Sequence, residues 1–219
     1  MAAQYSGRAA LIMPKRSSSG RWKQRQARDP YVKRAQSEGF HSRAAYKLQE
    51  IDQKERLLRR VALVVDLGAA PGGWSQVAAD AVGESGTVVA VDLLPMEAVA
   101  GVHFIQGDFC DEVVMQQLQA SLAGDRADLV LSDMAPNISG NWSVDQPRSI
   151  HLAEVALAAA GQLLKPGGAF IAKVFQGEGF EELVRDCRGQ FGTVRIRKPS
   201  ASRAESREMY VVAIGFRLV

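Results

Sequence analysis

The sequence predicts an α/β fold with a mostly parallel, doubly wound sheet that ends in an antiparallel edge hairpin. Three observations support this prediction. From residue 61 onward, short runs rich in β-branched residues alternate with segments of helical periodicity. A glycine-rich turn, "GAAPGGW", joins the first such run to the helix that follows it. The last two runs are separated by only a short polar loop, which favours antiparallel pairing.

The first helix is expected over residues 43–58, "RAAYKLQEIDQKERLL". Its apolar residues, Leu48 and Ile51 among them, share one face, and Ser42 is placed to cap its first turn. Lys47 falls to one side of this apolar stripe, so its side chain can face a groove.

Five strands are expected next, each a short apolar or β-branched run. They cover residues 61–68, 86–93, 102–109, 127–136 and 169–175. Helices are expected over residues 72–83, 111–124, 149–168 and 181–191, the third closed by Pro166, Gly167 and Gly168. Residues 193–199 and 208–216 supply the C-terminal hairpin. Strands that alternate with crossover helices require a sheet covered on both faces.

The chain is long enough for one sizeable core, with 219 residues of which 47% are hydrophobic. No Pro/Gly/Ser-rich linker divides it, so we expect one domain over residues 36–219 and a basic, flexible extension over residues 1–35. No apolar run reaches the roughly 18 residues of a membrane span, and the N-terminus lacks a secretory signal. These features predict a soluble, cytoplasmic protein, and we expect a monomer.

The two cysteines, Cys110 and Cys187, lie far apart and outside any CxxC or Cys/His cluster. The three histidines are equally scattered. This spacing indicates neither a disulfide framework nor a zinc site, so no metal ion is expected.

Positive charge is concentrated near the N-terminus. Residues 1–60 hold 15 Lys/Arg against 5 Asp/Glu, whereas residues 61–219 hold 12 against 19. Trp22 and Tyr31 interleave with these cations, a pattern typical of nucleic-acid binding. The competing interpretation is a mitochondrial transit peptide, because residues 1–28 contain Arg and Ser but no acid.

A ligand site is expected where the strands end, because doubly wound sheets bind ligands beyond the carboxyl ends of their strands. Gly68, Gly72 and Gly73 remove side chains at the first strand-to-helix turn and allow close backbone approach. Asp92, about 20 residues further on, is placed to bind ribose hydroxyls. Ala70 stands where dinucleotide-binding proteins carry the glycine that admits pyrophosphate, which favours a nucleoside ligand without phosphates over NAD.

Acids also stand at the ends of the other strands. Asp66 precedes the glycine turn, Asp108 lies in "QGD" and could address an adenine amino group, and Asp133 ends the fourth strand. For Asp92 and Asp108, a turn or helix cap is the structural alternative. Together these residues resemble the S-adenosylmethionine site of Rossmann-like class I methyltransferases. The cofactor contacts that this resemblance implies are Gly72, Trp74, Asp92, Asp108 and Asp133.

A series of motifs extends the resemblance to the FtsJ/RrmJ (RlmE) family. In order they are "SRAAYKLQEID", "VVDLGAAPGGWSQ", "VDLLPM", "QGDF", "SDMAPNISG", "KVFQGEGF" and "RKPSASRAESREMYVV". The resemblance covers roughly residues 17–216. Members of the family are bacterial S-adenosylmethionine-dependent methyltransferases that modify a uridine 2′-hydroxyl in 23S ribosomal RNA of the large subunit. The resemblance implies this fold, cofactor, activity and partner for the present chain.

An RNA substrate would give the basic N-terminal segment a role, because cations there can neutralise phosphates. The cations expected to contact RNA phosphates are Arg16, Arg21, Lys23, Arg25, Lys33 and Arg34. Residues 1–15 precede the family resemblance, so no role is assigned to them.

The family also implies a Lys-Asp-Lys-Glu tetrad, supplied here by Lys47, Asp133, Lys173 and Glu208. Asp133 and Lys173 lie at or near the carboxyl ends of neighbouring strands, and Glu208 begins an antiparallel strand at the same edge. Lys173 also lies within the apolar run "AFIAKVF", where an ammonium group is costly unless something nearby needs it.

A ribose hydroxyl needs in-line positioning and a sink for one proton or for developing negative charge. Lys173 fits either role, as a base when uncharged or as an electrostatic stabiliser when charged. Asp133 would orient Lys173, while Lys47 and Glu208 would hold the ribose and complete the charge balance.

Three other functions stay open from the sequence. The first keeps the chemistry and changes the substrate to transfer RNA. The second is an NAD-linked oxidoreductase, against which Ala70 and the lack of an obvious hydride-transfer partner both argue. The third is a non-enzymatic ribosome-assembly factor, disfavoured because the tetrad is complete.

Overall fold

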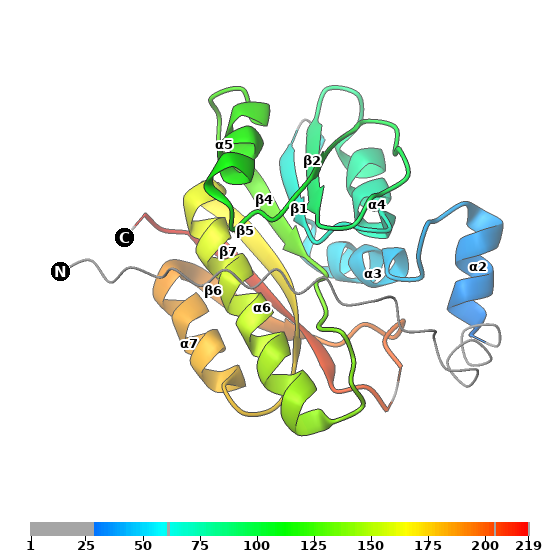
Figure 1. Ribbon diagram of the computed structural model, residues 1–219. Helices are drawn as coiled ribbons and strands as arrows, with labels where there is room; N and C mark the ends of the chain where they lie inside the picture. Colours follow the sequence, from blue (N-terminus) through cyan, green and yellow to red (C-terminus); the bar gives the residue numbers. More distant parts are fainter. Residues whose placement is uncertain (1–28, 61, 204, 219) are drawn as a thin grey trace.

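A seven-stranded sheet with the order β3-β2-β1-β4-β5-β7-β6 forms the centre of the computed structural model (Figure 1). The structure describes residues 29–60, 62–203 and 205–218. The strands are β1 Leu63–Leu67, β2 Thr87–Asp92, β3 Val102–Gln106, β4 Ala127–Ser132, β5 Leu164–Phe175, β6 Phe191–Arg197 and β7 Glu208–Phe216. Strands β1 to β5 pair in parallel, whereas β7 pairs antiparallel with both β5 and β6. The predicted fold class is confirmed.

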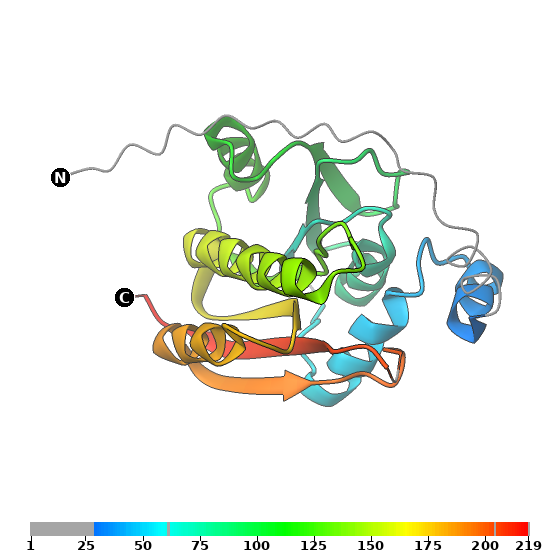
Figure 2. The same ribbon diagram turned by 60° about the horizontal axis from the view of Figure 1, so that its bottom comes forward.

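Helices cover both faces of this sheet (Figure 2). They are α2 Pro30–Glu38, α3 Ala45–Glu55, α4 Gly73–Val82, α5 Glu112–Ser121, α6 Trp142–Leu163 and α7 Phe180–Gln190. Apolar residues of α3 and α4 pack on one face, and those of α5, α6 and α7 pack on the other.

Side chains of strand β5 pack against the helices on both faces of the sheet. Phe170 and Val174 belong to the cluster under α6 and α7, whereas Ile171 belongs to the cluster under α3 and α4. Alternate side chains of a strand point to opposite faces, so an apolar run is what a strand buried on both faces requires. Lys173 follows Ile171 by two residues and therefore lies on the α3 and α4 side of the sheet.

Helix α6 differs from the predicted helix over residues 149–168 at both of its ends. It begins at Trp142, where the Asn141 side chain accepts a hydrogen bond from Ser143 N, and Pro147 lies inside the helix. It ends at Leu163, because Leu164 already pairs with Ala127 of β4. Pro166, Gly167 and Gly168 therefore belong to β5 and do not close the helix, as we had expected.

A register shift in the β4–β5 pairing explains this difference at the end of α6. Leu164 pairs with Ala127, but the next pair joins Ala169 to Leu129. The residues between Leu164 and Ala169 leave the regular pairing, and Gly167 among them has a φ of 82° that favours glycine.

The N-terminal end of the described chain contains a helix that the pattern analysis missed. Asp29 caps α2 by accepting a hydrogen bond from Tyr31 N, and Pro30 occupies the first helical position. The expected boundary between residues 35 and 36 falls inside this helix. The division into an extension and a domain stays a prediction.

Ser42 does not cap α3 with its side chain, so this prediction was wrong. Its backbone carbonyl accepts a hydrogen bond from Ala45 N at 3.3 Å, and Ala44 is the N-cap residue. The Ser42 hydroxyl instead packs against Gly73, where an added Cβ would lie 2.3 Å from Oγ. Close contact with the glycine turn therefore replaces the expected cap.

Candidate active site

The four predicted tetrad residues meet at the carboxyl edge of β4 and β5, as two ion pairs. Lys173 Nζ lies 3.0 Å from Asp133 Oδ1, and Lys47 Nζ lies 2.8 Å from Glu208 Oε1. Asp133 directly follows β4, Lys173 lies in β5, Glu208 begins β7 and Lys47 comes from α3. Four separate elements thus bring together a cluster with no net formal charge.

Tyr210, which the sequence analysis did not single out, connects the two ion pairs. Its hydroxyl lies 3.0 Å from Asp133 Oδ1 and 3.1 Å from Glu208 Oε1. Tyr210 pairs with Lys173 across the sheet, and Lys47 Nζ lies 5.9 Å from the centre of its ring. Only the spacing in "EMY" could have pointed to it, because Glu208 and Tyr210 are two residues apart and share one face of β7.

Burial controls the ionisation of this cluster. Desolvation raises the pKa of Tyr210 well above its ordinary value, and the charges of Asp133 and Glu208 raise it further. Tyr210 is therefore a neutral hydrogen-bond donor at every physiological pH. Burial also raises the pKa of Glu208, but the positive charges of Lys47 and Lys173 and the hydrogen bonds from Lys47 and Ser202 outweigh it. The net pKa of Glu208 is lowered, so this carboxylate stays ionised.

The cluster still has an opening to solvent. The exposed fractions of its side chains are 7% for Lys173, 11% for Lys47, 12% for Glu208 and 19% for Asp133. The charged groups are therefore largely dehydrated yet accessible to a substrate that covers the opening. Dehydration strengthens electrostatic interactions with such a substrate.

Helix α3, which carries Lys47, is attached to its surroundings at both ends. Trp74 Nε1 donates a hydrogen bond to Ala44 O at 2.8 Å, next to the first turn of α3. Near the C-terminal end, Glu55 accepts hydrogen bonds from Arg195 and Arg197 of β6. These contacts fix the position of Lys47 relative to the sheet.

The glycine turn follows β1, as predicted. Gly72 has a φ of 111°, and an added Cβ would come within 3.0 Å of His41 Nδ1 and of Met96 Sδ. Both backbone conformation and crowding therefore require glycine at this position. The Asp92 carboxylate supports the same turn, because it accepts hydrogen bonds from Ala70 N at 2.9 Å and from Leu94 N at 2.8 Å.

Asp92 and Asp108 lie at the ends of the neighbouring strands β2 and β3. Both make the turn contacts that we had considered as the structural alternative, since Asp108 Oδ1 accepts a hydrogen bond from Cys110 N. Both are also partly exposed, and a carboxylate oxygen can accept more than one hydrogen bond. Turn formation and ligand binding are thus compatible at these two residues.

The Trp74 side chain belongs to the protein core. Trp74 is only 2% exposed, and its ring packs against that of Tyr210 with centroids 5.7 Å apart. Its indole N–H is occupied by Ala44, so the side chain supports α3 and the tetrad. Any contact of Trp74 with a ligand would come from its backbone.

Asp66 adds a buried acid beneath the glycine turn. It is fully buried, and its Oδ2 accepts a hydrogen bond from Ser75 Oγ at 2.7 Å. Its Oδ1 has no hydrogen-bond partner within the described part of the chain. The pKa of Asp66 is raised to about 7, because burial, together with the charges of Asp133 and Asp92, outweighs the hydrogen bonds from Ser75.

These features fit S-adenosylmethionine. A glycine turn that presents backbone rather than side chains and several acids at one sheet edge match a nucleoside ligand that has hydroxyl and amino donors and a cationic sulfonium. The orphaned Asp66 Oδ1 is a further buried acceptor beside the turn. By contrast, no group of His, Cys, Asp or Glu side chains suited to a metal ion occurs among the described residues.

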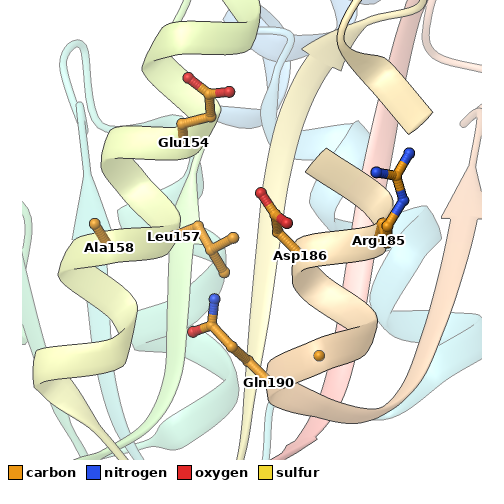
Figure 3. Close-up of a pocket in the computed structure, with 7 residues that line it drawn as sticks. Glu154, Leu157, Ala158, Arg185, Asp186 and Gln190 are labelled. Carbon is orange, nitrogen blue, oxygen red and sulfur yellow. The ribbon is translucent and has the colours of Figure 1, made fainter. Parts of the chain in front are cut away.

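A hollow of about 450 Å³ lies elsewhere, between α6 and α7 (Figure 3). Its lining includes Glu154, Leu157, Arg185 and Asp186, and it contains none of the predicted site residues. The predicted site residues therefore lie at the edge of the sheet and not in this hollow.

Of the six cations expected to contact RNA, only Lys33 and Arg34 fall within the described chain, on α2. Lys33 is exposed, and Arg34 Nε lies 2.8 Å from Glu38 Oε1 on the same helix. Surface pairs of this kind are weak, so Arg34 can exchange Glu38 for another anion. Arg16, Arg21, Lys23 and Arg25 lie outside the described residues. No helix within the described ranges is long and apolar enough to cross a membrane.

Several known proteins are similar to this chain in sequence or fold. A family model described as FtsJ-like methyltransferase matches residues 40–216. "Ribosomal RNA large subunit methyltransferase E" of Marinobacter nauticus is 57% identical over 94% of this chain and 100% of its own length. The protein of that name from Hahella chejuensis is 53% identical over 94% and 100%. The crystal structure of a ribosomal RNA methyltransferase from Plasmodium falciparum is 30% identical, with a TM-score of 0.71 over 81% of this chain and 98% of that chain. The chain therefore belongs to the FtsJ-like methyltransferase family.

Proposed function

We propose that the protein transfers a methyl group from S-adenosylmethionine to the 2′-hydroxyl of a uridine in 23S ribosomal RNA of the large subunit. The observation that carries this proposal is the pairing of Lys173 with Asp133 and of Lys47 with Glu208 at one sheet edge. The likeness to relatives named for large-subunit ribosomal RNA methylation supports the substrate.

The cofactor would lie along the carboxyl ends of β1, β2 and β3. Gly72 would leave room for it, Asp92 would accept hydrogen bonds from its ribose hydroxyls, and Asp108 would address its adenine amino group. Trp74 would contribute through its backbone, and Asp133 would lie near the reactive end. When bound, S-adenosylmethionine supplies a sulfonium-activated methyl group, whose C–S bond breaks as the ribose oxygen forms the new C–O bond.

The tetrad would bind and orient the nucleophile. Lys173 donates to both the carboxylate and the backbone carbonyl of Asp133, which fixes the direction of its amino group. From this position an uncharged Lys173 would accept the 2′-hydroxyl proton, whereas a charged Lys173 would stabilise the developing alkoxide. Lys47, held by Glu208, would contact the ribose from the side of α3.

The partner would be ribosomal RNA within the large subunit, with the basic N-terminal segment on its phosphates. The six cations named from the sequence would supply this attraction, which is sensitive to salt. We further propose that the protein acts as a monomer in the cytoplasm.

The decisive experiment is methyl transfer with labelled S-adenosylmethionine. Large ribosomal subunits from a strain lacking this protein should accept one 2′-O-methyl group per particle, mapped to a single uridine. Transfer RNA from the same strain is the control substrate and should stay unlabelled. Labelling of transfer RNA alone would favour the alternative function, 2′-O-methylation of transfer RNA. Cofactor binding without transfer to any RNA would favour an assembly factor.

A further inference from the structure

Three side chains form an exposed cluster beside the tetrad, which we call the Trp142 cluster. It consists of Trp142 at the start of α6, Phe175 at the end of β5, and Arg207 directly before β7. The rings of Trp142 and Phe175 are nearly parallel, at 28°, with centroids 5.8 Å apart. The guanidinium carbon of Arg207 lies 4.7 Å from the centre of the Trp142 ring.

The backbone places this cluster next to the reaction centre. Phe175 follows Lys173 by two residues and pairs directly with Glu208 across the sheet. Arg207 precedes Glu208, and its carbonyl accepts a hydrogen bond from Gln176 N at 2.9 Å. The cluster thus adjoins Glu208, and Phe175 lies two strand residues, roughly 7 Å, beyond Lys173 along β5.

Trp142 and Arg207 are both open to solvent. Trp142 is 39% exposed, in contrast to the 2% of Trp74 in the core. Arg207 is exposed and makes no salt bridge within the described residues, unlike Arg34, Arg43 and Arg203. The cation–π contact orients the guanidinium over the indole and leaves planar groups open to a ligand.

We propose that the Trp142 cluster binds an unpaired base of the RNA substrate next to the methylated nucleotide, by stacking on the indole and guanidinium planes. Proteins bind single-stranded RNA in this way, because every base offers a π face and Arg adds attraction to the backbone. This inference rests on the proposed function, since it assumes that RNA reaches the tetrad. Stacking contacts the π face that all bases share, so the cluster would position the RNA without selecting a particular base.

The cluster is held in place before any RNA binds. Asp145, which is buried in α6, accepts hydrogen bonds from Ser139 N, Ser139 Oγ and Gly140 N in the loop leading to Trp142. Phe175 N donates to Ser149 Oγ of the same helix at 3.0 Å. A surface that is already ordered loses little conformational entropy on binding, which favours affinity.

The test compares Trp142→Ala and Arg207→Ala with the wild type on large subunits that lack the modification. Both variants should weaken particle binding about 5- to 150-fold, the range for loss of one base stack. Trp142→Phe should retain most of the affinity because a ring remains. Affinity for S-adenosylmethionine should be unchanged in all three. Arg185→Ala, which removes an exposed arginine of α7, is the matched control and should bind like the wild type.

A substrate change separates stacking from a structural effect. In a model RNA hairpin that carries the target uridine, removal of the neighbouring base should weaken wild-type binding but have little further effect in Trp142→Ala. Full wild-type affinity of Trp142→Ala for particles, or equal losses from base removal in both proteins, would overturn the inference. Either result would leave methyl transfer by the wild type intact. Absence of transfer by the wild type would instead refute the proposed function.

Discussion

The hydroxyl of Tyr210 lies 3.0 Å from Oδ1 of Asp133 and is the link through which the two ion pairs of the tetrad become one network. A phenol carries one proton, so it can donate fully to only one carboxylate at a time. Asp133 and Glu208 therefore compete for the same donor, and substrate binding can shift that donor from one carboxylate to the other.

Replacement of Tyr210 by Phe should slow methyl transfer about 10- to 100-fold, the value of one hydrogen bond to a charged group. The ring contact with Trp74 would be kept, so folding and cofactor affinity should change little. Single-turnover rates on large subunits, measured beside cofactor titrations, check this. An unchanged rate would restrict Tyr210 to a packing role.

Lys173→Ala should reduce single-turnover transfer by about 100- to 10,000-fold, because it removes the group proposed to receive the proton or to stabilise the alkoxide. Cofactor binding should persist. Lys173→Arg distinguishes the two roles, since arginine keeps the charge but cannot act as a base. Equal loss in Ala and Arg variants would favour the base, whereas partial activity of the Arg variant would favour electrostatics. Near wild-type activity of Lys173→Ala would contradict both.

Asp92→Ala should weaken S-adenosylmethionine binding strongly in calorimetry, because it removes the proposed acceptor for ribose hydroxyls and the support of Ala70 N. Asp92→Asn is the matched variant, which keeps one acceptor oxygen and should lie between Ala and the wild type. Circular dichroism should show an intact fold in both. Wild-type affinity in the Ala variant would place the cofactor elsewhere.

Asp66→Asn should change how stability depends on pH. The folded pKa of Asp66, about 7, lies above its ordinary value of 3.8, so the native state binds more protons than the unfolded state between these values. Wild-type stability should therefore be lost as pH rises through 7, by roughly 2–3 kcal/mol from this group between pH 5 and pH 8. The Asn variant should lack this loss while resembling the wild type at pH 5. Urea titrations at pH 5 and pH 8 measure the free energy of unfolding of both proteins. An equal loss of stability between these pH values in the wild type and the variant would contradict a raised pKa of Asp66.

Neutralising the basic N-terminal segment should flatten the salt dependence of particle binding. Each lost phosphate contact should reduce the slope of log K against log salt concentration by about 0.7–0.9. A first variant would replace Arg16, Arg21, Lys23 and Arg25 by Gln, and a second would replace Lys33 and Arg34. An unaltered slope in both variants would remove the segment from the RNA interface. Cofactor affinity is the internal control for each.

Local sequence patterns predicted the strands and most helices, because periodicity and glycine-rich turns act within a few residues. They failed at the two ends of α6. The start was missed although its cap is local, because Pro147 lies inside the helix, where proline is unfavourable. The other end depends on a distant partner, since Leu164 pairs with Ala127 of β4, and that contact cannot be read from a short stretch of sequence.

The tetrad could be named in advance because the motifs that carry it match a family and three of its members, Asp133, Lys173 and Glu208, lie at or near strand ends. Tyr210 could not, because a tyrosine inside an apolar strand has the pattern of a core residue until the register of β5 and β7 is known. The same applies to Trp74, whose place in a glycine-rich motif suggested a ligand contact although its side chain faces the core.

Strand β7 is the last strand along the sequence, yet it lies between β5 and β6 in the sheet. Lys47 and Glu208 are separated by 161 positions, so their pairing must wait until β7 has been inserted. A chain still emerging from the ribosome has the glycine turn long before it has a complete tetrad. The ion pair of Lys47 with Glu208 can therefore form only when almost the whole chain has been made, and a chain that ended before β7 would lack it.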